Sequence, residues 1–344
     1  MTAAIRRQRR LAVPKRFADA FLVFIIGTFI VLLALRAASG GPSYFIQILT
    51  YGLANGSIYA LIALGYTMVY GIVELINFAH GDVFTLGAFV SLALLPLLGL
   101  QEGASGPGMI LPLLVVFVVT MVFCGLVNVA IERVAYRPLR NAPRLAPLIT
   151  AVGMSFVLEG IMFLWRGPFN LHYPDLIPDI RIPLGVGATI GLKDLVVIGT
   201  AIVLVIGLTL FIERSRLGKA MRATAQDRDA AQLMGIDTDR TISATFFIGA
   251  VLAAAGGIVF GLYYNNISFD LGFSAGLFAF TAAVFGGIGN IQGAALGGLI
   301  IGIVRSMWDG YFDSQWSDVI IFAILIMVLV FRPTGLLGMR VPEK

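Results

Sequence analysis

Polar side chains that could contact a substrate gather in one stretch of the chain that is otherwise apolar. The segment YGLANGSIYALIALGYTMVYGIVELINFAHGDVFTLG, residues 51–87, is apolar enough to lie in a bilayer, yet it contains amide, phenol, imidazole and carboxylate groups. Such groups lose hydration at membrane depth, so they persist only where they face a bundle interior, a water-filled cavity or one another. Five of them are therefore our candidates for lining a polar pathway: Asn55, Tyr59, Asn77, His80 and Asp82.

The segment INFAHGD, Ile76 to Asp82, has two further interpretations. It can be a tight turn between two membrane spans, with Gly81 supplying the bend. Alternatively, Glu74, His80 and Asp82 can form a proton relay in a transporter that is driven by an ion gradient. Hydropathy fixes the depth of a residue only to within about one helical turn, so the sequence leaves all three interpretations open.

The composition of the 344 residues indicates a membrane protein with several spans. Hydrophobic residues make up 58% of the chain and charged residues 12%, whereas soluble domains are about 45–50% apolar and about 25% charged. The net charge of +5 does not indicate nucleic-acid binding, because the basic residues stand in short clusters between apolar runs. The single cysteine, Cys124, and two separated histidines, His80 and His172, predict neither a disulfide framework nor a metal site or other cofactor.

Ten apolar segments are candidates for transmembrane or re-entrant helices. They are residues 17–35, 46–73, 83–100, 109–131, 146–165, 195–212, 241–263, 273–290, 294–308 and 319–331. A straight helix needs about 20 apolar residues to cross a bilayer, so the short or glycine-rich segments after Phe273 can be re-entrant. The glycines of segment 46–73 allow that helix to be discontinuous. The expected fold is an all-α polytopic membrane protein of about ten helices, with eight as the lower count.

The basic residues set the expected orientation. Most of the 24 lysines and arginines lie in residues 1–16, 133–144, 214–240 and 332–344, which fall on one side of the membrane when the segments are threaded in order. Short loops rich in lysine and arginine stay in the cytoplasm, so both termini are expected there. The chain then divides into a basic cytoplasmic segment 1–16, one transmembrane domain 17–338 with a cytoplasmic loop 213–240, and a tail 339–344.

The loop 213–240 contains a short predicted helix on which a cytoplasmic partner can dock. Asp227 is a suitable N-cap, Ala230 and Ala231 favour helix, and Gly235 is placed to end it. The segment DAAQLMG, which begins at Asp229, resembles the EAA-xxx-G signature of ABC importer permeases, with aspartate in place of glutamate. In that family the loop fits a cleft of the ATP-hydrolysing subunit, so the resemblance implies that these five residues couple the chain to an ATPase. The alternative is a surface helix that only joins two spans.

Three other stretches carry a more specific resemblance. They are GSIYALIALGYTMVYGIVELINFAHGD (Gly56 to Asp82), FGGIGNIQGAALGG (Phe285 to Gly298) and RPTGLLG (Arg332 to Gly338). Together with the loop, they resemble the permease subunits of branched-chain amino-acid ABC importers. The resemblance implies a multi-pass subunit of the bacterial cytoplasmic membrane. Its implied partners are a second, related permease, two cytoplasmic ATPase subunits and an extracytoplasmic binding protein.

The substrate class stays open at this point. Urea and short-amide permeases of the same family share the core formed by Asn77, Ala79, His80 and Gly81, so an amide importer is the alternative to an amino-acid importer. The segment YALIALGYTMVYGI is closer to the amino-acid permeases. The chain has no Walker A sequence, since Gly218-Lys219 is followed by alanine. ATP hydrolysis is therefore expected on partner chains, and this chain is not expected to be an enzyme.

Glycines at four-residue spacing predict close helix packing near the C-terminal end. Gly289, Gly293 and Gly297 would lie on one helix face, where another backbone can approach. A dinucleotide-binding loop is not indicated, because the spacing departs from G-x-G-x-x-G and no soluble strand precedes it.

Two charges and two loops give further expectations. Glu159 and Arg305 lie inside apolar segments, and we expect them to pair unless each reaches the membrane interface separately. The proline-containing loop 166–193, together with residues 309–317, is expected either to receive a binding protein or to act as a structural lid over the bundle.

Overall fold

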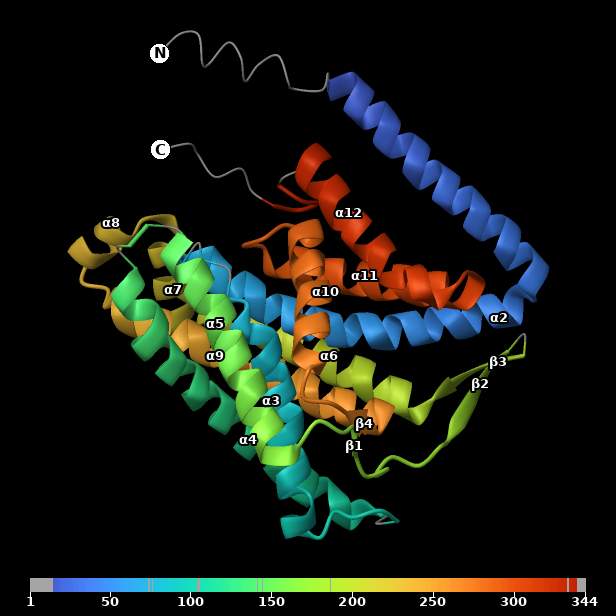
Figure 1. The fold of residues 1–344 in the computed structure, drawn as a ribbon, viewed down its shortest axis with the longest axis horizontal. Coiled ribbons are helices and arrows are strands. Elements are labelled where there is room, and N and C mark those ends of the chain that lie inside the picture. Colours follow the sequence, from blue (N-terminus) through green and yellow to red (C-terminus); the bar gives the residue numbers. More distant parts are fainter. Residues whose placement is uncertain are drawn as a thin grey trace.

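The chain folds as a bundle of helices (Figure 1). The structure is a computed structural model that describes residues 15–73, 75, 77–103, 106–140, 142–143, 145–185, 187–332 and 334–338. Its longer helices are α2 (Lys15–Val73), α3 (Ala79–Leu94), α4 (Ile110–Ile131), α5 (Leu145–Arg166), α6 (Leu192–Arg214), α9 (Thr238–Tyr264), α10 (Leu271–Gly286), α11 (Ile291–Tyr311) and α12 (Ser317–Phe331). Most of the expected basic segment 1–16, and all of the tail 339–344, lie outside the described residues.

Shorter elements connect these helices. Between α6 and α9 lie α7 (Arg216–Gln226) and α8 (Arg228–Leu233). Single helical turns are η1 (Pro96–Leu98), η2 (Pro107–Met109), the π-helical η3 (Glu132–Tyr136), η4 (Arg137–Leu139) and η5 (Ser314–Trp316). The strands form two antiparallel pairs, β1 (Leu171–His172) with β4 (Asn266–Ile267) and β2 (Arg181–Gly185) with β3 (Ala188–Gly191).

Eight helices in the described part of the chain are long and apolar enough to cross a membrane. They are Gly40–Val73, Ala79–Leu98, Ile110–Leu139, Leu145–Arg166, Leu192–Arg214, Thr238–Tyr264, Ile291–Tyr311 and Ser314–Phe331. Helix α10 is apolar but has 16 residues, which gives a length of about 24 Å. The N-terminal candidate segment 17–35 forms the first part of α2. A mostly helical protein with several membrane-crossing helices is thus confirmed.

Helix α2 bends once, at Gly41, where φ is 80° and ψ is 161°. Pro42 follows, and proline disfavours the helical conformation in the residue before it. The expected discontinuity within segment 46–73 is wrong, because the helical backbone continues through it. Its glycines serve packing instead: a Cβ at Gly52 or Gly56 would come within 3.0 Å of the α11 backbone.

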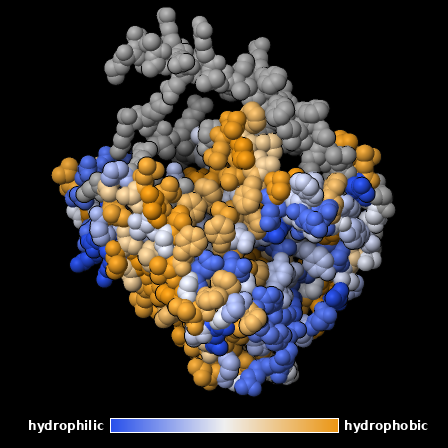
Figure 2. All heavy atoms as spheres, in the orientation of Figure 1, coloured by the Kyte–Doolittle hydropathy of each residue, from blue (hydrophilic) through white to orange (hydrophobic). Residues whose placement is uncertain are grey.

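Helices α2, α3 and α9 form the protein core. In their most apolar stretches 83%, 67% and 78% of the residues are buried, compared with 22% in each of α4, α5 and α6. Side chains that stay exposed on apolar helices are suited to a lipid surface. Figure 2 agrees, because the surface over α4 and α5 is largely apolar while the end that carries α8 is hydrophilic.

The loop between α5 and α6 is packed onto the bundle. Tyr173 is fully buried, and its hydroxyl lies 3.0 Å from the Ser91 hydroxyl of α3. Burial raises the pKa of Tyr173, so this hydroxyl keeps its proton. Lys193 forms a 2.9 Å ion pair with Asp175. In Figure 1 this loop and the β2–β3 hairpin lie at the opposite end of the bundle from α8.

Candidate functional site

The five pathway candidates fall into two separate clusters. The buried cluster, around the start of α3, consists of Tyr66, Asn77, His80, Asp82, Tyr136 and Ser155. The open cluster, where α2 meets α9, α11 and α12, consists of Asn55, Tyr59, Tyr264, Arg305, Ser306, Asp309 and Asp318. The structure therefore brings Asn77, His80 and Asp82 together, and it places Asn55 and Tyr59 in a different environment.

Side chains of the buried cluster contact one another with little access to water. Tyr136 donates a 2.7 Å hydrogen bond to Asn77 Oδ1, and Ser155 donates one to the Asp82 carboxylate. The His80 ring packs edge-on against Tyr66, with 4.8 Å between ring centroids. Asp82 lies in the first turn of α3, where the helix dipole favours a negative charge. None of the six residues is more than 5% exposed.

Several polar atoms of the buried cluster lack a partner. Asn77 Nδ2 and both ring nitrogens of His80 make no hydrogen bond of normal geometry within the described residues. A buried polar atom without a partner costs about 1–3 kcal/mol. Packing around the buried cluster must therefore compensate for this cost and keep the cluster closed.

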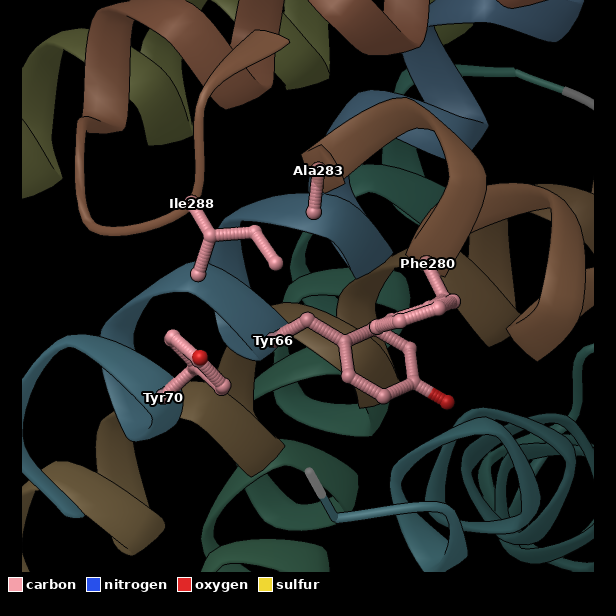
Figure 3. Close-up of a pocket in the computed structure, with 5 residues that line it drawn as sticks. All are labelled: Tyr66, Tyr70, Phe280, Ala283 and Ile288. Carbon is pink, nitrogen blue, oxygen red and sulfur yellow. The ribbon is translucent and has the colours of Figure 1, made fainter. Parts of the chain in front are cut away.

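Close backbone contacts close the buried cluster. A Cβ at Gly65 would overlap the His80 ring, and a Cβ at Gly81 would overlap the backbone of α10. A neighbouring cavity of about 10 Å³ lies between α2 and α10 (Figure 3). It is lined by Tyr66, Tyr70, Phe280, Ala283 and Ile288. Such a volume holds about one water molecule, so no organic substrate fits beside the buried cluster in this conformation.

The open cluster joins polar groups from four helices, α2, α9, α11 and α12. Asn55 donates to Ser306 Oγ over 3.2 Å and accepts from the Tyr264 hydroxyl over 2.5 Å. Arg305 donates a 2.8 Å hydrogen bond to the Tyr59 hydroxyl. The Tyr264 residue is 45% exposed, so water can exchange with this cluster.

The expected ion pair between Glu159 and Arg305 does not form. Arg305 instead lies 3.8 Å from the Asp309 carboxylate and 3.5 Å from that of Asp318. The helices explain the difference, since α5 packs on α3 whereas α11 packs on α2 and α10. The Arg305 guanidinium and the Glu159 carboxylate therefore lie in different parts of the bundle.

The predicted helix in the loop 213–240 is present as α8. The Asp227 carboxylate accepts hydrogen bonds from the backbone N–H groups of Asp229 and Ala230, at 2.9 and 3.0 Å. Ala231 is buried, and Gly235 ends the segment with φ at 83°. These contacts confirm the N-cap and the stop. The two side chains directly before Gly235 are apolar and strongly exposed, Leu233 by 88% and Met234 by 83%.

Helix α8 is attached to the end of α2, close to the buried cluster. Arg228, its first residue, donates a 2.8 Å hydrogen bond to the carbonyl of Ile72. Only four residues lie between Ile72 and Asn77 in the sequence. A displacement of α8 would therefore act directly on the connection between α2 and α3.

A charged network ties the start of α9 to the end of α4. Arg140 bridges Glu132, whose side chain is fully buried, and Asp239, which it reaches at 2.5 Å. Ser243 donates a 2.6 Å hydrogen bond to Glu132. Burial lowers the pKa of Arg140, and the Glu132 carboxylate opposes this change. A polar cavity of about 230 Å³ adjoins the network and is lined by Arg133, Arg137, Asp237, Asp239, Arg240 and Ser243.

The glycine prediction for α11 needs one correction. Gly293 and Gly297 lie against the α10 backbone at Gly286 and Ala282, where a Cβ would overlap. Gly289 is not on that helix face, because α11 begins at Ile291 and Gly289 adopts a φ of 90° in the preceding turn. Only Gly293 and Gly297 therefore lie on one face of the same helix.

The C-terminal motif RPTGLLG packs against the same turn. Backbone N–H groups of Leu336 and Leu337 donate to the carbonyls of Phe285 and Gly286, each over 2.9 Å. Asn290 donates a 2.8 Å hydrogen bond from its side chain to the Leu337 carbonyl. Two motifs that are far apart in the sequence thus form one joint at the end of α10.

Several members of the clusters were not among the sequence candidates. They are Tyr66, Tyr136, Ser155, Tyr264, Ser306, Asp309 and Asp318. Tyrosine and serine in apolar runs give no spacing signal, and the two aspartates lie near the end of α11 and at the start of α12. Among the described residues, no three His, Cys, Asp or Glu side chains are placed to hold a metal ion.

Comparison with known proteins gives a consistent result over nearly the whole chain. The chain is 44% identical over 305 residues to the high-affinity branched-chain amino acid transport system permease protein BraD of Pseudomonas aeruginosa, covering 88% of this chain and 98% of that protein. It is 43% identical over 311 residues to the permease protein LivH of Escherichia coli K12, with the same coverage. A probable branched-chain amino acid transport permease protein, LivM of Methanocaldococcus jannaschii, is 29% identical over 152 residues, 39% of this chain and 43% of that protein.

No solved structure matches the chain. The family model described as "Branched-chain amino acid transport system / permease component" matches residues 48–329. That range contains both clusters, α8 and most of α12. The chain therefore belongs to the family of permease components of branched-chain amino acid transport systems.

Proposed function

We propose that this chain is a permease subunit of an ATP-driven ABC importer for branched-chain or related hydrophobic amino acids. The observation that carries the proposal is the identity of 43–44% across 88% of the chain to two permeases of high-affinity branched-chain amino acid transport. The chain supplies the path through the membrane, and partner subunits hydrolyse ATP.

The proposed location is the bacterial cytoplasmic membrane, with both termini and α8 on the cytoplasmic side and about ten helices in or across the bilayer. Two observations support this orientation. Helix α8 and the strand pair β2–β3 lie at opposite ends of the bundle (Figure 1), and the basic residues of the loop 213–240 follow the rule for cytoplasmic loops.

The proposed complex contains a second homologous permease, two cytoplasmic ATPase subunits and an extracytoplasmic binding protein. The similarity to both LivH and LivM permeases supports a pair of related permease chains. The loop between α5 and α6, with Asp309 to Ser317, offers the outer surface for the binding protein, and its packing through Tyr173 gives that surface a fixed shape.

Coupling to the ATPases is proposed to act through α8. Leu233 and Met234 supply exposed apolar contacts that a cleft of the ATPase can bury. Asp227, Asp229, Ala230, Ala231 and Gly235 build the helix that presents them. Arg228 then passes the movement to α2 through Ile72. ATP binding shifts the bundle only if it favours one of two conformations, as any ligand-driven change requires.

The two clusters are proposed to mark the two ends of the substrate pathway. Asn55 and Tyr59 lie in the open cluster, which water reaches. Asn77, His80 and Asp82 lie in the buried cluster, which this conformation closes. Opening of the buried cluster would hydrate its unpartnered atoms and let the substrate leave.

Reconstitution of the chain with its partner subunits tests this function. Leucine, isoleucine or valine, delivered by the binding protein, should stimulate ATP hydrolysis and accumulate inside vesicles, while urea and acetamide should not. Stimulation by urea or an amide alone would favour the alternative substrate class. Uptake by the chain alone under an ion gradient would contradict an ATP-driven importer and favour a secondary transporter.

A further inference from the structure

The open cluster contains an arginine whose role the proposed function leaves unassigned. The Arg305 side chain is 26% exposed and donates to the Tyr59 hydroxyl over 2.8 Å. Its guanidinium carbon lies 4.2 Å from the centroid of the Phe278 ring. Phe278 in turn stacks on Phe322 of α12, with 6.0 Å between centroids. Aromatic rings and a phenol thus fix the position of a cation that is still within reach of water.

The two acidic partners of Arg305 are close but not tightly bound. The nearest nitrogen–oxygen distances are 3.8 Å to Asp309 and 3.5 Å to Asp318, both longer than a normal hydrogen bond of about 2.7–3.2 Å. By contrast, Arg140 reaches Asp239 at 2.5 Å. A guanidinium has five N–H donors, so Arg305 keeps donors free for another carboxylate.

The acidic partners also remain accessible. The Asp318 side chain is 59% exposed and that of Asp309 is 39% exposed. Asp309 accepts a hydrogen bond from Ser317, and Asp318 lies in the first turn of α12, so both carboxylates have fixed positions. With one arginine and two aspartates, the trio carries an excess negative charge that favours an added cation.

These contacts match the two charges of an α-amino acid. Resting on the proposed function, we infer that Arg305, Asp309 and Asp318 form a binding site for the zwitterionic head group of the substrate. The substrate carboxylate binds Arg305 in place of Asp318, and the substrate ammonium binds the Asp318 carboxylate that this exchange releases. The exchange breaks one ion pair and forms two, so an amino acid can bind and leave without exposing an unpaired charge.

The site also distinguishes amino acids from urea and short amides, the two substrate classes that the sequence leaves open. Urea and short amides carry neither a carboxylate nor an ammonium group, so they cannot replace either partner in the Arg305–Asp318 pair. Binding them would leave the charged contacts as they are. The trio therefore indicates a zwitterionic amino acid as the substrate of this permease.

Protection of Arg305 from an arginine-specific dicarbonyl reagent tests the site directly. The complete transporter without binding protein is treated with phenylglyoxal, and modification of Arg305 is quantified by mass spectrometry. L-Leucine at millimolar concentration should slow the modification by about threefold or more, whereas urea and leucinamide should not. Protection should be lost in Asp318→Asn. Arg181, which is exposed and lies 3.3 Å from Asp179, is the internal control whose modification leucine should not change.

Transport by variants distinguishes a substrate site from a structural ion pair. Arg305→Gln should lower ATP-driven leucine uptake by about tenfold or more, and Arg305→Lys, which keeps the charge, should retain most of it. ATP hydrolysis stimulated by the loaded binding protein should change by less than about twofold in both, because the site acts after delivery.

The possible failures point to different conclusions. If leucine does not protect Arg305 while the same preparation takes up leucine, the head-group site is wrong and the proposed function stands. If Arg305→Gln lowers hydrolysis and uptake equally, the arginine is structural and the site is also wrong. If the intact transporter takes up urea and no amino acid, the proposed function fails and this inference fails with it.

Discussion

The buried cluster and the open cluster each contain a hydrogen bond from a tyrosine hydroxyl to an asparagine side chain, but the two bonds lie in different environments. In the buried cluster the Tyr136 hydroxyl donates to Asn77 over 2.7 Å, and in the open cluster the Tyr264 hydroxyl donates to Asn55 over 2.5 Å. Tyr136 is almost fully buried, whereas Tyr264 is 45% exposed. Loss of the first bond would leave an orphan acceptor, while water can replace the second.

On the proposed pathway, this difference would leave one end accessible to water and the other end closed. The buried cluster includes unpartnered polar atoms, and glycine contacts at Gly65 and Gly81 keep it closed. Its closed form therefore carries an energetic cost that opening would remove. A transporter needs two conformations separated by a small free-energy difference, so that ATP can shift their populations.

The largest expected effect comes from separating the two helices that build the open cluster. A Cβ at Gly302 of α11 would overlap the backbone of Gly56 on α2, so Gly302→Leu forces the helices apart. We expect a loss of about 3 kcal/mol in stability and little folded protein. Yield of monodisperse protein in detergent and its melting temperature measure this.

Gly207→Leu is the matched control for that substitution. Gly207 lies on the exposed face of α6 with no atom near its missing Cβ, so the same change should leave yield and melting temperature nearly unaffected. Equal losses in both variants would mean that leucine itself, and not the contact between α2 and α11, causes the defect.

The next largest effect concerns the charged network between the end of α4 and the start of α9. Arg140→Leu leaves Glu132 buried without its cation but still bonded to Ser243, so the loss of stability should be about 2–3 kcal/mol. Replacing both residues by leucine should recover much of that stability, because no lone charge remains. The melting temperatures of the single and double variants measure this effect. A double variant that is no more stable than Arg140→Leu would show that the lone charge of Glu132 is not the cause of the loss.

Local chemistry made parts of this structure predictable from the sequence. The helix α8 follows from Asp227, Ala230 and Gly235, whose capping and stop effects depend on a few adjacent residues. Most membrane segments follow from hydropathy, because a helix in lipid must satisfy its backbone internally. The family follows from motifs that extend over most of the chain.

The arrangement of the site could not be predicted in the same way. Asn55 and Asn77 belong to the same polar stretch of the sequence. They lie in different clusters, since the second part of α2 separates them. Arg305 takes its partners from α2 and α12 because of how α11 packs, which no local pattern encodes. Gly289 stands four residues before Gly293, which predicted a shared helix face. Its positive φ and the start of α11 at Ile291 show that it lies outside the helix.

A smaller effect is expected from removing one hydroxyl of the buried cluster. Tyr136→Phe leaves Asn77 Oδ1 without its donor, at a cost of about 1–3 kcal/mol to the closed form. The bundle should then open more readily, and ATP hydrolysis without substrate should rise by a few fold, about threefold or more. Calorimetric melting and basal hydrolysis in the reconstituted complex measure the two effects.

Tyr173→Phe controls for the loss of a buried hydroxyl elsewhere. Tyr173 is equally buried but bonds Ser91 beneath the loop between α5 and α6, away from the buried cluster. Its melting temperature should fall by a similar amount while basal hydrolysis stays the same. A rise in basal hydrolysis in both variants would show that general loosening of the bundle, and not the Asn77 contact, controls the ATPases.

The smallest expected effect on stability is at the matching hydroxyl of the open cluster. Tyr264→Phe removes the bond to Asn55, but water can take its place at this exposed position, so stability should change by less than about 0.5 kcal/mol. Basal ATP hydrolysis should stay at the wild-type level, because the closed buried cluster is untouched. Leucine uptake should fall by about threefold if Asn55 needs this hydroxyl to face the path. If Tyr264→Phe destabilises the protein as much as Tyr136→Phe, water does not distinguish the two clusters, and the assignment of one as open and the other as shut is wrong.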